Sequence, residues 1–164
     1  MFNPDSLKLP FFDHSHRALY ADAKTWASAA LPNRVHTGNV DEHCIKLTRQ
    51  MGEAGWLRYC VPAEYGGALT ELDSRSICLL RQTLGYYDGL ADFAFVMQGL
   101  GSGPISLFGS EALKQKYLPH VASGKMLAAF ALSEPEAGSD VAAMTTRATR
   151  TTQGYRLNGV KTWI

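Results

Sequence analysis

Apolar residues recur at helical spacing through most of the first 120 positions of the chain. One such stretch begins at Asp13, whose carboxylate can cap a helix, and ends at Pro32. A second runs from about 41 to 54 and ends at Gly55. The spacing predicts two amphipathic helices. Their apolar faces carry Leu19, Ala23, Trp26, Ala27 and Ala30 in the first helix, and Cys44, Leu47, Met51 and Ala54 in the second.

The same periodicity predicts three further helices. The third starts near Asp73, the fourth follows the Asp88-Gly89 break and contains Pro104, which can kink or split it, and the fifth is capped by Ser110. The expected faces carry Ile77, Leu80 and Leu84 in the third helix, Phe93, Val96, Met97 and Leu100 in the fourth, and Leu113, Tyr117 and Val121 in the fifth.

After Lys125 the pattern changes to short apolar or Thr-rich runs of strand length. Residues 127–132, 145–152, 154–157 and 161–164 fit strands, with turn signals at Gln153-Gly154 and at Asn158-Gly159, the latter favouring a type I′ hairpin. We predict a mainly α chain, with a helical domain over 1–125 and the first strands of a β-barrel-like domain over 126–164. We expect a truncated sheet, because the last strand has only started at Ile164.

Composition adds little to this picture. Hydrophobic residues make up 46% of the chain and charged residues 19%, which is typical of a soluble globular protein. A net charge of +1 gives no field that would gather nucleic acid or an anionic membrane. The chain has no secretory signal and no apolar run long enough to span a bilayer, so we expect a cytoplasmic location.

Cysteine and histidine side chains give no metal-binding pattern. Cys44, Cys60 and Cys78 lack ligand spacing, and we interpret them as reduced core residues. His14 and His16 would point to different faces of one helix, and we expect all five histidines to be surface or capping residues. The sequence therefore predicts no metal site.

The segment Ser133 to Asp140 is the strongest candidate for a binding loop. It is built mainly from small residues, so backbone N–H groups can approach an anionic ligand closely, and the hydroxyls of Ser133 and Ser139 add donors. Taken alone, the pattern is more typical of a structural turn.

Longer motifs change that interpretation. Residues 132–140 (LSEPEAGSD) with 161–164 (KTWI) resemble the flavin-binding signature of the acyl-CoA dehydrogenases. Residues 55–67, which end in VPAEYGG, and 114–119 (KQKYLP) are similar to two further motifs of that family. The resemblance implies the front part of a longer FAD enzyme of fatty acid metabolism that oxidises an acyl-CoA thioester between its α and β carbons.

The resemblance also implies site residues. The positions that contact FAD correspond to Phe130, Leu132, Ser133, Gly138, Ser139 and Trp163. Ser139 would also reach the substrate, and Trp163 would lie against the isoalloxazine. Glu136 stands where many members have glycine, and we expect it to face solvent, since an inward carboxylate would repel phosphate.

The acyl tail would lie along the fourth helix. Phe93, Val96 and Leu100 match pocket-lining positions of the family, and their bulk suggests a short or compact acyl group, although ordinary helix packing explains them equally well. The nearby glycines 99, 101 and 103 resemble a dinucleotide loop, but no strand precedes them, so close helix packing is the better explanation.

The catalytic base is expected beyond Ile164, in the family's carboxy-terminal helical domain. Glu134 is not assigned to this role, because a Glu-Pro pair at a turn is usually structural. No residue of this chain is therefore predicted to be catalytic, and the chain alone should be inactive.

The resemblance implies acyl-CoA as substrate, an electron-transfer flavoprotein as electron acceptor and assembly into homo-oligomers. Two alternatives stay open. The chain could be a noncatalytic acyl-thioester or protein-interaction module of the same fold, or a relative of the acyl-CoA oxidases or flavin monooxygenases.

Overall fold

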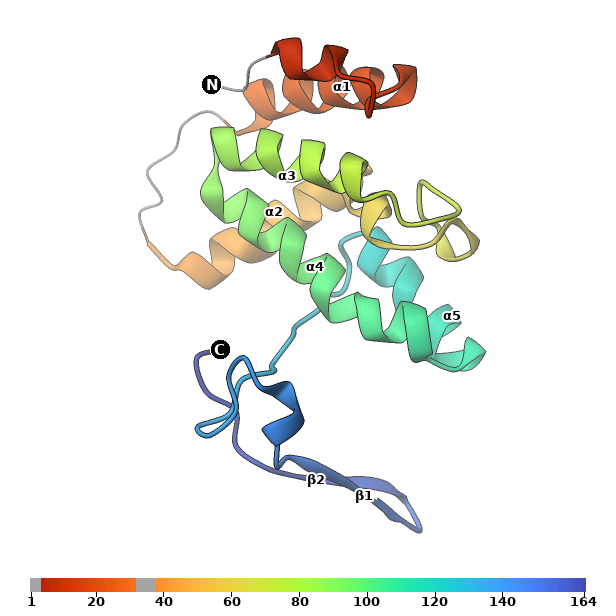
Figure 1. Ribbon diagram of the computed structural model, residues 1–164, viewed down its shortest axis with the longest axis vertical. Coiled ribbons are helices and arrows are strands. Elements are labelled where there is room, and N and C mark those ends of the chain that lie inside the picture. Colours follow the sequence, from red (N-terminus) through yellow and green to blue (C-terminus); the bar gives the residue numbers. More distant parts are fainter. Residues whose placement is uncertain (1–3, 32–37) are drawn as a thin grey trace. The chain divides into compact units, whose positions relative to one another are not determined.

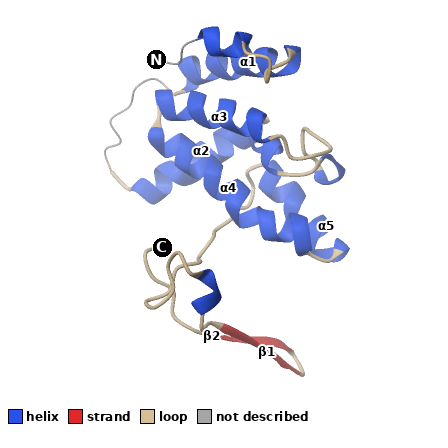
Figure 2. Ribbon diagram, viewed as in Figure 1, coloured by secondary structure: helices blue, strands red, loops and turns tan. Residues whose placement is uncertain are grey.

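The computed structural model describes residues 4–31 and 38–164, and the chain forms two compact units, Met1–Ala129 and Phe130–Ile164. Within the described residues the first unit is helical, and the second contains a two-stranded sheet (Figures 1 and 2). This confirms the predicted mainly α fold. The α-helices are α1 (His14–Ala30), α2 (Val40–Glu53), α3 (Ser74–Tyr87), α4 (Gly89–Phe108) and α5 (Glu111–Ala122). Short 3-10 helices are η1 (Pro4–Lys8), η2 (Trp56–Cys60), η3 (Ala63–Tyr65) and η4 (Val141–Ala143).

Polar side chains start each α-helix by accepting hydrogen bonds from its first free N–H groups. The predicted caps Asp13 and Ser110 are confirmed, and Asp73 and Asp88, predicted only as the start of the third helix and the break before the fourth, also act as caps. Helix α2 starts slightly earlier than predicted, because Asn39 caps it through Asp41 and Glu42. Pro32, the predicted end of the first helix, lies outside the described residues.

The predicted buried faces are confirmed for α1, for α3 and, apart from the exposed Ala54, for α2. The prediction is wrong for α4 and only partly right for α5, where Val121 is buried as expected. Helix α4 packs through Phe95, Gln98 and Ser102, and it continues through Pro104 without a break. Leu113 of α5 is 44% exposed, whereas Leu118 is fully buried. A helix that is apolar on more than one side gives no unique inward face, and tertiary packing then decides.

Of the three free cysteines, only Cys60 is a core residue. Burial raises the pKa of its thiol to about 12, so the thiol stays protonated and unreactive. Cys44 is half-buried and Cys78 is exposed, which corrects the prediction that all three lie in the core.

The loop from Gly55 to Gly67 folds tightly against α5. The buried Tyr65 donates its hydroxyl to Glu111 at 2.8 Å, which raises the pKa of Tyr65 to about 12. Arg58 donates to the carbonyls of Gly66 and Gly67. The motif at 55–67 therefore has a structural role, because it fixes the connection between α2 and α3.

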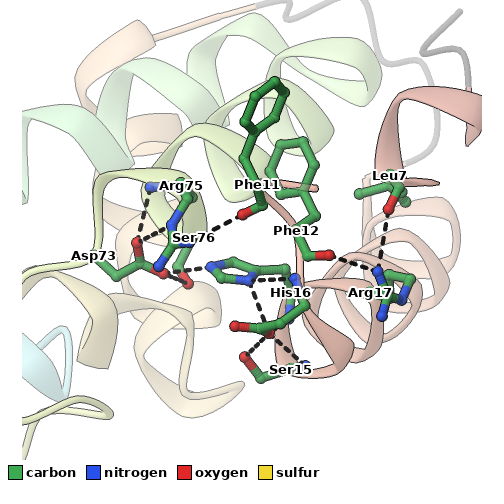
Figure 3. Close-up of polar contacts among 10 residues, drawn as sticks. Leu7, Phe11, Phe12, Ser15, His16, Arg17, Asp73, Arg75 and Ser76 are labelled. Atoms are coloured by element: carbon green, nitrogen blue, oxygen red, sulfur yellow. Dashed lines mark hydrogen bonds and ion pairs between the residues drawn. The ribbon is translucent and has the colours of Figure 1, made fainter. Parts of the chain in front are cut away.

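A buried histidine joins the caps of two helices that lie side by side, α1 and α3 (Figure 3). The Nδ1 atom of His16 accepts the backbone N–H of Asp13, and its Nε2–H donates to Asp73 at 2.6 Å. Burial would raise the pKa of the Asp73 carboxyl, but hydrogen bonds from Arg75, Ser76 and His16 hold it below its usual range. His16 thus has the predicted capping role but is not a surface residue.

Replacing His16 with alanine should lower the free energy of unfolding by about 3 kcal/mol, because one hydrogen bond to a carboxylate and one to a cap backbone are lost. His14, which is exposed on the same helix, provides the matched control, and His14→Ala should change stability by less than about 0.5 kcal/mol. Urea unfolding followed by circular dichroism measures both. Equal stabilities of the two variants would contradict a role for the His16 junction.

In the second unit, β1 (Arg147–Thr151) pairs antiparallel with β2 (Gly154–Asn158), as predicted. The turn lies at Thr152-Gln153, so the prediction of a hairpin turn at Asn158-Gly159 is wrong. Residues 127–132 and 161–164 are not strands either. A strand requires a hydrogen-bonded neighbour along its length, and the described residues supply none for these two segments beyond a single bond from Thr162 to Ser133.

Candidate functional site

The loop Ser133 to Asp140 is closed by a tight turn. The N–H of Glu134 donates to the carbonyl of Ala137 at 2.9 Å, and the N–H of Ala137 donates back to Glu134 at 3.2 Å. Both residues are buried, whereas Gly138 and Ser139 are exposed. Asp140 then caps η4 through the N–H of Ala142. The turn therefore directs its glycine and its second serine outward.

The carboxylate of Glu134 is the centre of this unit. One oxygen accepts the N–H and hydroxyl of Thr145 at 2.7 and 2.9 Å, and the other accepts the N–H of Thr146 and the ammonium of Lys161 at 3.1 and 3.0 Å. The donors of Thr146, Thr145 and Lys161 hold the pKa of Glu134 far below its usual range. Such a carboxylate is a poor proton acceptor.

Lys161 also connects the loop to the end of the chain. Its ammonium donates to the carbonyl of Leu132 at 2.9 Å, and the N–H of Thr162 donates to the carbonyl of Ser133 at 2.9 Å. Two segments that are nearly thirty positions apart therefore run together. The sequence analysis grouped these two segments as one family signature but did not predict that Lys161 joins them, because no local pattern links Lys161 to Glu134.

Trp163 follows directly and is 93% exposed. Its φ of 57° places a bulky residue in the left-handed region, which side chains rarely adopt and which marks functional positions more often than ordinary ones. Its indole ring is therefore available to a ligand rather than packed in a core.

These residues fit a planar ring system with an attached phosphate group. A side chain built at Gly138 would meet nothing within 4 Å, so open space adjoins the turn. The exposed hydroxyl of Ser139 and the exposed indole of Trp163 provide a donor and a flat apolar surface. Phe130, Leu132 and Ser133 are half-buried and complete the set predicted from the sequence. Glu136 is exposed, as expected.

In the first unit, the predicted acyl-facing residues occupy the outer side of α4. Phe93 is 54% exposed, Leu100 is 47% exposed and Val96 is half-buried. Val96 and Leu100 line an apolar cleft of about 370 Å³, and Phe93 is not among its lining residues. Core packing of this unit therefore does not account for Phe93 and Leu100, which leaves them available for contacts outside the core.

The described residues contain no group of three or more His, Cys, Asp or Glu side chains placed to hold a metal ion. In the same part of the chain, no helix combines the length and apolar character needed to cross a membrane.

Comparison with known proteins places both units in one family. Residues 13–125 match the model of the acyl-CoA dehydrogenase N-terminal domain, and residues 129–164 match the model of the acyl-CoA dehydrogenase middle domain.

Individual relatives agree with this match. A protein of Bacillus subtilis named as a probable acyl-CoA dehydrogenase is 42% identical over 125 residues, which make up 75% of this chain and 21% of that protein. One from Mycobacterium leprae, also named as a probable acyl-CoA dehydrogenase, is 34% identical over 163 residues, or 98% of this chain and 40% of that protein.

Among solved structures, an acyl-CoA dehydrogenase complexed with FAD from Bacillus anthracis has a TM-score of 0.71 and 32% identity, and the match covers 99% of this chain and 28% of that one. The chain therefore spans less than half the length of each of these three relatives.

Proposed function

Because this chain belongs to the acyl-CoA dehydrogenase family, we propose that the whole protein is an FAD-dependent oxidoreductase that introduces a double bond between the α and β carbons of an acyl-CoA thioester. The observation that carries the proposal is the paired arrangement of the loop at 133–140 with Lys161 to Trp163, held together by the Glu134–Lys161 ion pair. FAD, when bound, would accept the hydride that leaves the β carbon.

The residues of this chain would hold and orient the cofactor. Phe130, Leu132 and Ser133 lie on the segment that Lys161 fixes, and we propose that they contact the flavin ring with Trp163 against its face. Gly138 and Ser139 would receive the phosphate, since both are exposed at the outer side of the turn. Ser139 would also contact the substrate.

The proton on the α carbon requires a separate base. Glu134 does not meet this need, because its two oxygens already accept four hydrogen bonds. We propose that a glutamate in the family's carboxy-terminal helical domain removes the proton. Phe93, Val96 and Leu100 would contact the acyl group from α4.

The proposal is tested by purifying the full-length protein and adding acyl-CoA thioesters without oxygen. We expect bound FAD, identified by its absorption spectrum, and bleaching of that spectrum by a straight-chain acyl-CoA. Pivaloyl-CoA, which has no α-hydrogen, is the control and should cause no bleaching. Binding of acyl-CoA without any bleaching would favour a noncatalytic module. Rapid reoxidation with oxygen consumption, once oxygen is admitted to the reduced protein, would favour an oxidase.

We further propose that the electrons pass to an electron-transfer flavoprotein, and that the enzyme is a cytoplasmic homo-oligomer of fatty acid metabolism. Family membership supports the electron acceptor, the assembly and the metabolic role, whereas the cytoplasmic location rests on the sequence expectation alone. Reduction of a purified electron-transfer flavoprotein, the native mass in solution and cell fractionation test them one by one.

A further inference from the structure

Met144 lies beside the ammonium group that joins the two segments of the candidate site. The Nζ atom of Lys161 donates to the sulfur of Met144 at 3.6 Å. Its other two bonds go to the Leu132 carbonyl and the Glu134 carboxylate. An ammonium group has three N–H donors, and a thioether sulfur is a weak acceptor. Two donors of Lys161 therefore meet strong acceptors, whereas the third meets a weak one.

The backbone on both sides of Met144 is fixed by hydrogen bonds. The N–H of Met144 donates to the carbonyl of Val141 at 3.3 Å, at the end of η4. The next residue, Thr145, donates both its N–H and its hydroxyl to Glu134. The contact between sulfur and ammonium is therefore made from an anchored position of the chain.

The side chain of Met144 is also open to solvent. It is 39% exposed, whereas Met51 is fully buried and Met97 is half-buried. Met126 has a similar exposure of 42%, but its sulfur accepts no hydrogen bond from the described residues. Among the methionines that the structure describes, Met144 alone combines an exposed side chain with a hydrogen-bonded sulfur.

We propose that Met144 is a modification site at which a peroxide converts the thioether into a sulfoxide, and that the sulfoxide tightens the link between Lys161 and the loop at 133–140. A sulfur lone pair attacks one peroxide oxygen, so an S–O bond forms and the O–O bond breaks. Sulfur loses two electrons, and the departing hydroxide takes the proton of the transferred oxygen, so hydrogen peroxide is reduced to water. Methionine sulfoxide reductases reverse this oxidation.

The lysine favours both the reaction and its product. A positive charge beside the sulfur stabilises the negative charge that develops on the departing oxygen. The sulfoxide oxygen is a stronger acceptor than the thioether sulfur, and the exposed side chain can turn this oxygen toward the poorly matched N–H of Lys161. The bonds to Leu132 and Glu134 use the other two donors, so they need not break. Oxidation thus adds a charge-assisted bond to the existing link.

Treatment of the full-length protein with dilute hydrogen peroxide tests the proposal. Peptide mass spectrometry follows the sulfoxides, and we expect Met144 to be oxidised about two- to fivefold faster than Met126, as one exposed charge interaction allows. The N–H of Thr162 donates to Ser133 and reports on the link between the two segments. Hydrogen exchange of the peptide that contains Thr162 should slow by about two- to fivefold after oxidation, and methionine sulfoxide reductases should restore its rate.

Three variants assign the effect to one sulfur. Met144→Leu should abolish the influence of peroxide on this hydrogen exchange, whereas Met126→Leu, the matched control, should preserve it. Met144→Gln supplies a carbonyl oxygen without oxidation, so it should slow the exchange of Thr162 in the absence of peroxide. Each variant changes an exposed side chain, and cooperative urea unfolding checks that it is folded.

The opposite results are equally clear. Oxidation of Met144 no faster than that of Met126, or a Thr162 exchange rate that is unchanged or higher after oxidation, would overturn the proposal. A peroxide effect that persists in Met144→Leu would do the same, because another residue would then cause it. These measurements use no acyl-CoA, so their outcome is independent of the proposed function.

Discussion

Replacing Gly67 with alanine is expected to unfold the first unit under conditions in which the unmodified protein is stable. A side chain at this position would overlap the carbonyl oxygen of Val61 and lie 2.6 Å from the carbonyl carbon of Pro62. Both are backbone atoms of a buried turn, so no side chain can move aside. We expect the free energy of unfolding to fall by more than about 4 kcal/mol, which is exceptional for a single substitution.

Two other glycines, Gly66 and Gly89, separate this overlap from other effects. Gly66 has a φ of 91° but open space around it, so Gly66→Ala should cost only the backbone strain of about 1–2 kcal/mol. Gly89, which begins α4, has open space and no positive φ, and Gly89→Ala should change stability by less than about 0.5 kcal/mol. Urea unfolding of the three variants ranks them by their loss of stability. A Gly67→Ala variant as stable as Gly66→Ala would show that the turn can rearrange.

The Gly67 turn also shows how far the sequence alone could lead. The glycine pair after Pro62 predicted an ordered loop, and local residue preferences were sufficient for that. The reason why only glycine fits at position 67 was not visible, because the obstructing carbonyl belongs to Val61, which the folded turn brings back against it. Local signals thus predicted the loop but not its tolerance to change.

Local signals were also sufficient to predict where helices start. A cap acts within three residues, so Asp13 and Ser110 could be recognised as caps from sequence, and Asp73 and Asp88 as helix boundaries. The buried side of α5 could be recognised only in part, at Val121, since Leu113 and Leu118 are both apolar and only contacts with other helices select Leu118. The strands predicted at 127–132 and 161–164 failed for a related reason, because a strand depends on a partner rather than on its own composition.

The candidate site was predicted in part. The residues of the binding loop were identified through a family motif, whose small residues and serines have a local meaning. The ion pair between Glu134 and Lys161 joins positions 27 apart, and no periodic pattern connects them. The apolar cleft was missed as well, because its walls come from four separate parts of the chain.

Replacing Glu134 with glutamine is expected to remove most of the FAD from the full-length protein. Glutamine keeps the shape but turns one acceptor oxygen into a donor, which would face either Lys161 or the donors of Thr145. An unmet buried donor and an unpaired ammonium both destabilise the folded loop. The attachment of Leu132 and Ser133 to the segment around Thr162 should then loosen, and FAD affinity should fall on the order of tenfold or more.

Glu136 offers a matched control, since it lies two residues away in the same loop, carries the same charge and is exposed. Glu136→Gln should keep its FAD, because no residue of the unit depends on a buried Glu136 carboxylate. Lys161→Met should resemble Glu134→Gln, and the double variant should lose less than the sum of the two, because both single changes break the same pair. The ratio of flavin to protein absorbance after extensive dialysis measures each loss. Equal FAD content in Glu134→Gln and Glu136→Gln would mean that the ion pair does not position the loop for the cofactor.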